Sequence, residues 1–247
     1  MVKSIPNILT LLNLFSGCIA IVLVFNGAYT HASWLIVIAA VFDFLDGTAA
    51  RLLNARSELG KQLDSLADMV SFGVAPASIM YALMVNTMGY AVGGYVNLNA
   101  VPAFFIALFS ALRLAKFNID ASQTYSFRGL PTPANALFIS ALPFIHLHAI
   151  SKGSFHAMLG SWFDSYYVLL GLTLLLSFLL VSNLPLMGLK LKSVSWKENH
   201  YKYIFLILSV IMGILVGFSA APFILLLYIF LSVAEYYHMK FEAEEDE

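Results

Sequence analysis

Four aspartates lie in sequence that is otherwise mostly apolar, and they are the residues best suited to chemistry in this chain. They are Asp43, Asp46, Asp64 and Asp68, within the stretch VFDFLDGTAARLLNARSELGKQLDSLAD. A charged aspartate at the centre of a membrane helix costs about 3 kcal/mol or more, so such a residue is a functional candidate by default. Four of them close together require a common explanation.

The spacing of the aspartates supplies one. On a helix, residues three apart lie about 60° apart and residues four apart about 40° apart, so each pair shares one helix face. The short segment between the pairs makes the two helices antiparallel neighbours, and the carboxylates can therefore converge. Carboxylate oxygens suit hard ions such as Mg²⁺ or Mn²⁺. Two such ions would balance the charge and can clamp the attacking and leaving oxygens of a phosphoryl displacement.

Small residues beside the aspartates leave room for a bulky ligand. Gly47 and Ala50 share the face of the first aspartate pair, and Gly60 can let the backbone approach a phosphate or nucleotide. Arg51, at the end of its helix, can hold a diphosphate bidentately. The alternative for the small residues alone is close packing of membrane helices.

These residues reproduce the pattern D-x2-D-G-x2-A-R-x8-G-x3-D-x3-D without a departure. The sequence therefore resembles the CDP-alcohol phosphotransferase family. Further segments, at residues 5–10, 64–76, 112–118 and 128–133, are similar to the phosphatidylserine synthases within that family. The resemblance extends over about residues 5–140.

The resemblance implies a metal-dependent transfer of a phosphatidyl group from CDP-diacylglycerol to the hydroxyl of L-serine, which gives phosphatidylserine and CMP. It implies that Asp43 and Asp64 bridge two Mg²⁺ or Mn²⁺ ions, that Asp46 completes one metal site and Asp68 the other, and that Asp68 is the general base. It also implies a homodimer.

The remaining site residues are expected around the two substrates. The residues expected to contact the CDP-lipid are Asn7, Thr10, Asp43, Asp46, Gly47, Ala50, Arg51, Ser57 and Gly60. Serine brings a carboxylate, for which Arg113 and Arg128 are the candidate partners, with Asn118 and Lys116 behind them. The alternative for the Arg and Lys residues among them is a role in topology or in lipid headgroup binding.

The composition indicates an all-α, polytopic membrane protein. Of the 247 residues, 60% are hydrophobic and 11% charged, whereas soluble domains carry about 25% charged residues. The net charge of −1 gives no basis for nucleic-acid binding, and the single cysteine, Cys18, excludes an internal disulfide.

Apolar runs of near-spanning length predict about eight transmembrane helices. Their expected bounds are 7–27, 32–53, 63–86, 100–118, 132–150, 164–186, 202–218 and 222–240, with a tight turn at 219–222. With a cytoplasmic N-terminus, every Lys and Arg except Lys152 falls on the inner side, as the positive-inside rule requires. Both termini and the active site are therefore predicted to face the cytoplasm.

One integral membrane domain, 1–247, accounts for the chain, with a catalytic core at about 5–186 and peripheral helices at about 202–240. The expected location is the cell membrane. Two alternatives stay open: the same chemistry with glycerol 3-phosphate, inositol phosphate or an amino alcohol as acceptor, and a cation transporter. Transporter carboxylates usually lie near the membrane midplane. An inactive scaffold is disfavoured because no signature residue is missing.

Overall fold

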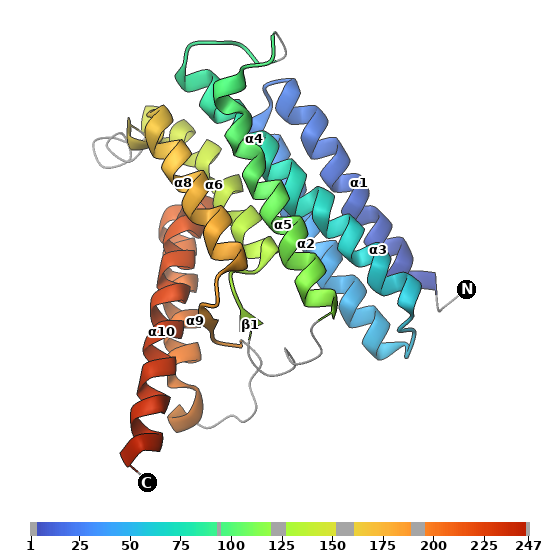
Figure 1. Ribbon diagram of the computed structural model, residues 1–247, viewed down its shortest axis with the longest axis vertical. Helices are drawn as coiled ribbons and strands as arrows, with labels where there is room; N and C mark the ends of the chain where they lie inside the picture. The colour runs from blue at the N-terminus through green and yellow to red at the C-terminus, as the bar shows by residue number, and fades with distance from the viewer. Residues whose placement is uncertain (1–3, 93–94, 120–126, 152–160, 189–195, 246–247) are drawn as a thin grey trace.

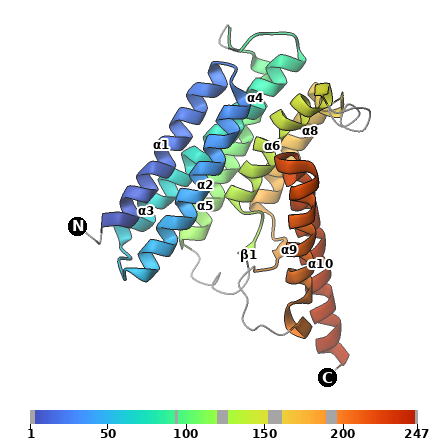
Figure 2. The same ribbon diagram turned by 180° about the vertical axis from the view of Figure 1, so that it is seen from behind.

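Helices packed side by side make up most of the chain, as seen in a computed structural model (Figures 1 and 2). The structure describes residues 4–92, 95–119, 127–151, 161–188 and 196–245. The main helices in chain order are α1 (Ile5–Phe25), α2 (Tyr29–Leu52), α3 (Glu58–Asp68), α4 (Ala75–Thr87), α5 (Phe105–Ile119), α6 (Thr132–Ser151), α8 (Tyr166–Val181), α9 (Trp196–Val216) and α10 (Ala221–Glu245). The prediction of a helical membrane protein is confirmed.

Four helical stretches of the described residues are long and apolar enough to cross a bilayer. They are Ile5–Phe25, Glu58–Thr87, Leu98–Ile119 and Asn199–Met239. Shorter apolar helices cover Thr132–Ile145 and Tyr166–Val181. The last of the four stretches contains both α9 and α10 (Figure 1). The number of membrane crossings stays a prediction.

Helix α1 packs against α2, α3 and α4. Most of the side chains that α1 buries are small or polar, among them Thr10, Asn13, Ser16 and Gly17. Small side chains let membrane helices approach closely and let polar groups bond across the interface. The contact face of α1 is therefore built for proximity rather than for bulky apolar packing.

The helical stretch Glu58–Thr87, which carries the second aspartate pair, begins earlier than expected and changes from an α-helix to a π-helix after Asp68. Its first helix, α3, begins at Glu58 rather than at residue 63, because the Ser57 hydroxyl accepts a 3.0 Å hydrogen bond from the Gly60 N–H and caps the helix. A π-helical segment, η2 (Met69–Val74), joins α3 to α4. Single π-helical turns inside helices occur frequently at functional sites.

The helix expected at 164–186 ends earlier, so that expected end is wrong. Helix α8 ends at Val181, and β2 (Pro185–Leu186) pairs antiparallel with β1 (Phe127–Arg128). A proline disfavours helical backbone at the residue before it and has no N–H for the helix ladder, which accounts for the early end.

Helices α9 and α10 form an antiparallel hairpin beside the bundle (Figures 1 and 2). The turn between them is a 3₁₀ segment, η4 (Gly217–Ala220), and Gly217 adopts a φ of +67°. The turn lies close to the position that the sequence predicts. A second 3₁₀ segment, η3 (Leu98–Phe104), leads into α5.

The first turn of α1 and the α2–α3 connection lie toward the same end of the helices α1, α2 and α3 (Figures 1 and 2). A common side of the membrane for the termini and the site stays a prediction. The side of the membrane that they face stays a prediction.

The loop before α6 is anchored by Gly129 against the end of α8. Gly129 has a φ of +78°, and a Cβ there would lie 2.7 Å from the Leu180 carbonyl oxygen and 2.8 Å from that of Ser182. Its N–H bonds the Leu184 carbonyl at 3.1 Å, and the next N–H, of Leu130, bonds that of Leu179 at 2.9 Å.

We therefore expect Gly129→Ala to lower the free energy of unfolding by about 2 kcal/mol or more, since it adds left-handed strain to a backbone clash. Thermal unfolding in detergent measures the change. Gly171→Ala in α8, where a Cβ meets no atom within 4 Å, is the control and should be neutral or slightly stabilising. Equal melting temperatures for the two variants would contradict this anchoring role.

Candidate active site

Three aspartates from two neighbouring helices converge. Asp43 of α2 and Asp64 and Asp68 of α3 each offer a carboxylate oxygen, and these oxygens all lie within 4.8 Å of one another. Asp68 is buried, and the other two are partly buried. Like charges at this separation in a low-dielectric surrounding repel strongly, so the cluster calls for cations or hydrogen-bond donors.

Asp46 lies outside this group of three and has a partner from the first helix. The hydroxyl of Thr10 donates to its Oδ2 at 2.6 Å, and only 5% of Asp46 is exposed. The same hydroxyl lies 3.0 Å from the Pro6 carbonyl oxygen. Asp46 is therefore held against α1, beside the cluster of three.

The aspartate cluster fits divalent metal ions by its donor atoms. All of the grouped ligand atoms are carboxylate oxygens, the donors that Mg²⁺ and Mn²⁺ prefer. The Oδ1 atom of Asp64 is buried without a hydrogen-bond partner among the described residues. A buried carboxylate oxygen without a donor is costly, and a metal ion would satisfy it.

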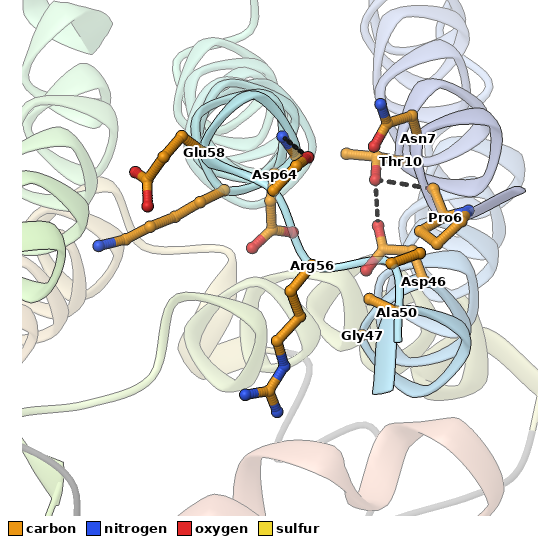
Figure 3. Close-up of a pocket in the computed structure, with 13 residues that line it drawn as sticks. Pro6, Asn7, Thr10, Asp46, Gly47, Ala50, Arg56, Glu58 and Asp64 are labelled. Atoms are coloured by element: carbon orange, nitrogen blue, oxygen red, sulfur yellow. Dashed lines mark hydrogen bonds between the residues drawn. The ribbon is translucent and has the colours of Figure 1, made fainter. Parts of the chain in front are cut away.

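A cavity of about 570 Å³ opens beside the aspartates between α1, α2 and α3 (Figure 3). Asp46 and Asp64 lie on its two sides, and their carboxylates are directed toward the space between the helices (Figure 3). The helices that form this cavity expose large apolar side chains on their outer faces, among them Phe44 and Leu52 of α2 and Leu59 of α3.

Most of the residues expected to contact the CDP-lipid line this cavity. They are Asn7, Thr10, Asp46, Gly47, Ala50, Ser57 and Gly60. Asp43 and Arg51 are not among the lining residues. Arg51 is exposed, and its Nε donates at 2.9 Å to the Gly47 carbonyl oxygen of its own helix.

Two cations that line the cavity were missed by the sequence reasoning. Arg56 and Lys61 both belong to its wall, and the Arg56 side chain extends away from the aspartates (Figure 3). Lys61 also donates from Nζ at 3.0 Å to the Asn118 carbonyl oxygen. Their positions in and just after the short segment between the aspartate helices were the available signal, since that segment must border the site.

The comparisons with known proteins bear directly on this geometry. A sequence model of the CDP-alcohol phosphatidyltransferase family matches residues 3–234, which include every aspartate of the cluster. The chain belongs to this family.

Relatives of this CDP-alcohol phosphatidyltransferase have names that specify a substrate. This chain is 35% identical over 208 residues to a CDP-diacylglycerol–serine O-phosphatidyltransferase of Helicobacter pylori, with 83% of this chain and 80% of the relative covered. It is 33% identical over 235 residues to the enzyme of that name from Mycobacterium leprae, covering 92% of this chain and 71% of the relative. An archaetidylserine synthase of Methanothermobacter thermautotrophicus is 38% identical over 141 residues, covering 56% of this chain and 57% of the relative.

The residues expected at the acceptor occupy different surroundings in this CDP-alcohol phosphatidyltransferase. Arg113 of α5 is partly buried, lies within electrostatic range of Asp68, and keeps its Nε buried without a hydrogen-bond partner among the described residues. Asn118 instead ties α5 to α3, because its Nδ2 donates to the Ser65 hydroxyl at 2.7 Å. The backbone of Arg128 lies in β1, and its side chain lies outside the described part of the structure.

Proposed function

We propose that this protein transfers the phosphatidyl group of CDP-diacylglycerol to the hydroxyl of L-serine, forming phosphatidylserine and CMP. The observation that carries the proposal is the convergence of Asp43, Asp64 and Asp68, all family-signature residues, beside the cavity. The names of the bacterial relatives support serine as the acceptor.

The cavity between α1, α2 and α3 is the proposed seat of the cytidine diphosphate. Its volume of about 570 Å³ suits a nucleotide. Arg56 and Lys61 of its wall supply positive charge for the diphosphate, and Gly47 and Ala50 leave one side free of bulky side chains. Arg51 would join the diphosphate by leaving its bond to the Gly47 carbonyl. The acyl chains would remain among the lipids that surround the exposed apolar side chains.

The metal ligands in this proposal are the four aspartates. Asp43 and Asp64 would be shared between two ions, with Asp46 completing one coordination sphere and Asp68 the other. Held by these residues, divalent ions would supply positive charge against the diphosphate and the departing CMP. Whether the ions are Mg²⁺ or Mn²⁺ does not change the residues required.

The group transfer needs one proton acceptor and one displaced group. As the serine hydroxyl oxygen forms its bond to the lipid-bearing phosphorus, its proton passes to the Asp68 carboxylate and the bond from that phosphorus to the CMP oxygen breaks. Asp68 is buried, at the edge of the aspartate cluster nearest the π-helical segment. A carboxylate is an ordinary weak base, so the alignment of the hydroxyl supplies much of the rate.

Arg113 is the proposed partner of the serine carboxylate. Its guanidinium is partly buried near Asp68, and its Nε has no hydrogen-bond partner among the described residues. A buried guanidinium with an unused donor favours a carboxylate ligand, which it can bind through two N–H groups. Arg128 is a second proposed partner. Asn118 would support the acceptor site indirectly, because its side chain bonds Ser65 of α3.

The protein is proposed to act in the cell membrane as a homodimer, with both termini and the site toward the cytoplasm. One membrane domain would hold the catalytic core, at about residues 5–186, and the peripheral α9–α10 hairpin. Two alternatives stay distinct from this proposal. Another acceptor alcohol would leave the aspartate chemistry unchanged, whereas a cation transporter would move ions without releasing CMP.

An acceptor assay tests the proposal as a whole. Purified protein is incubated with CDP-diacylglycerol, Mn²⁺ and, in separate reactions, labelled serine, glycerol 3-phosphate, inositol phosphate or ethanolamine. We expect CMP release and a labelled lipid with serine, and loss of both on chelation of the metal. A labelled lipid with another acceptor only would overturn the choice of serine. Ion flux without CMP release would overturn the enzyme assignment.

The aspartate roles predict two different losses. Asp43→Asn should reduce activity below detection, because it removes a shared metal ligand. Asp68→Asn should lower kcat by about 10²–10⁴-fold, the usual contribution of a general base, with a smaller effect on CDP-diacylglycerol binding. Steady-state kinetics and binding of the CDP-lipid measure both effects.

Asp164→Asn is the control, since Asp164 lines a different cavity together with Gly27 and Thr87, at the far ends of the helices. It should retain activity. Near wild-type kcat in Asp68→Asn would remove Asp68 as the base.

The role of Arg113 as partner of the serine carboxylate can be tested by the KM for serine. Arg113→Ala should raise the KM for serine about 10- to 100-fold, the range expected for a lost charge-assisted hydrogen bond, and leave the KM for CDP-diacylglycerol nearly unchanged. Lys116 is exposed on the same helix, so Lys116→Ala should leave the serine KM nearly unchanged and serves as the comparison. An unaltered serine KM in Arg113→Ala would exclude Arg113 from the acceptor site.

A further inference from the structure

The first helix carries polar side chains at a spacing of three residues on an otherwise apolar sequence. Asn7, Thr10 and Asn13 follow one another along α1. Thr10 is 3% exposed and Asn13 is fully buried. Buried polar side chains on membrane helices require partners, and those of Thr10 and Asn13 lie on the aspartate helices.

Each of the two buried residues donates a hydrogen bond to a different aspartate. The Thr10 hydroxyl donates to Asp46 Oδ2 of α2 at 2.6 Å, and Asn13 Nδ2 donates to Asp68 Oδ1 of α3 at 3.2 Å. Hydrogen bonds to a carboxylate are stronger than those between neutral groups. In the proposed function these two aspartates each complete one metal site beside the shared pair, Asp43 and Asp64, and we call them the flanking aspartates.

The position of Asn13 is itself set by contact with the π-helical segment. The Ser71 hydroxyl donates to the Asn13 carbonyl oxygen at 2.9 Å. One turn further along α1, a Cβ on Gly17 would lie 2.8 Å from the Cα of Ser71. The two backbones are therefore in direct contact, and α1 cannot slide or rotate without losing that fit.

We propose that Thr10 and Asn13 are positioning residues, each of which holds one flanking aspartate in the orientation that the reaction requires. The inference rests on the proposed function. Thr10 would orient Asp46 for metal and CDP-lipid binding, and Asn13 would orient Asp68 for proton transfer. The Oδ1 atom of Asn13 is buried and has no partner among the described residues, so the residue is not fully satisfied by helix packing.

A purely structural role for the two residues makes a different prediction. Helix-packing hydrogen bonds would affect stability and would alter all kinetic parameters together. Positioning of separate aspartates predicts separate kinetic defects. Ser16 offers the comparison, because it is a buried hydroxyl on the same helix and donates to the Leu12 carbonyl of that helix at 2.8 Å.

The test uses the full-length protein with Thr10→Val and Asn13→Leu, which remove the donors and keep the number and branching of the side-chain heavy atoms, and Ser16→Ala as the control. Asn13→Leu should lower kcat about 10- to 100-fold and leave both Mn²⁺ affinity and the KM for CDP-diacylglycerol within about twofold. Thr10→Val should weaken Mn²⁺ binding, measured by electron paramagnetic resonance, and raise the KM for CDP-diacylglycerol, each by about fivefold or more. Ser16→Ala should match the wild type.

The outcomes separate failure of this inference from failure of the proposed function. Absence of CMP release from the wild-type protein would reject the proposed function. If the wild-type protein is active, an unaltered kcat in Asn13→Leu would reject the positioning role of Asn13. The same change in all three variants would reject separate positioning roles for Thr10 and Asn13. Melting temperatures verify folding, and Asn13→Ala carries the same expectation if Asn13→Leu does not fold.

Discussion

Repulsion among carboxylates held between apolar helices is the constraint on which the rest of this structure depends. Asp43, Asp64 and Asp68 bring ligand oxygens within 4.8 Å of one another, in a partly to fully buried place where water screens their charge less than at a protein surface. Such a cluster is stable only with cations or donors close by. The hydrogen-bond donors on α1 meet part of that requirement, and the cavity beside the cluster, with Arg56 and Lys61 in its wall, gives ions access to the rest.

Close contact between backbones supplies the rigidity that the cluster needs. Gly17 lets α1 touch the π-helical segment at Ser71, and the Ser57 cap fixes where α3 begins. Asn118 and Lys61 join α5 to α3 on the other side. The aspartate helices are thus held from both flanks, while their connected end stays open to the cavity.

The sequence predicts the helical class and the aspartate cluster because both follow from composition and from regular helix spacing. It misplaces the end of α8 because the length of the apolar run outweighed the local signal of Pro185, while the pairing of Pro185 and Leu186 with β1 is a long-range contact that the sequence does not signal. It overlooks Asn13 for a similar reason: a lone asparagine in an apolar run gains meaning only when Asp68 of another helix lies opposite. Arg51 was expected at the diphosphate, whereas Arg56 and Lys61 line the cavity, because side-chain direction at a helix end depends on the turn that follows.

The apolar faces that border the cavity determine which concentration of the CDP-lipid, the phosphatidyl donor, governs the rate. Phe44, Leu52 and Leu59 project outward from the helices that form it, so a donor with two acyl chains can reach the aspartates by sideways diffusion within one leaflet. Its encounter rate then follows its mole fraction among the surrounding amphiphiles rather than its amount per volume. Adding inert detergent at constant total donor would slow the enzyme by surface dilution, while a water-soluble acceptor would still obey ordinary bulk kinetics.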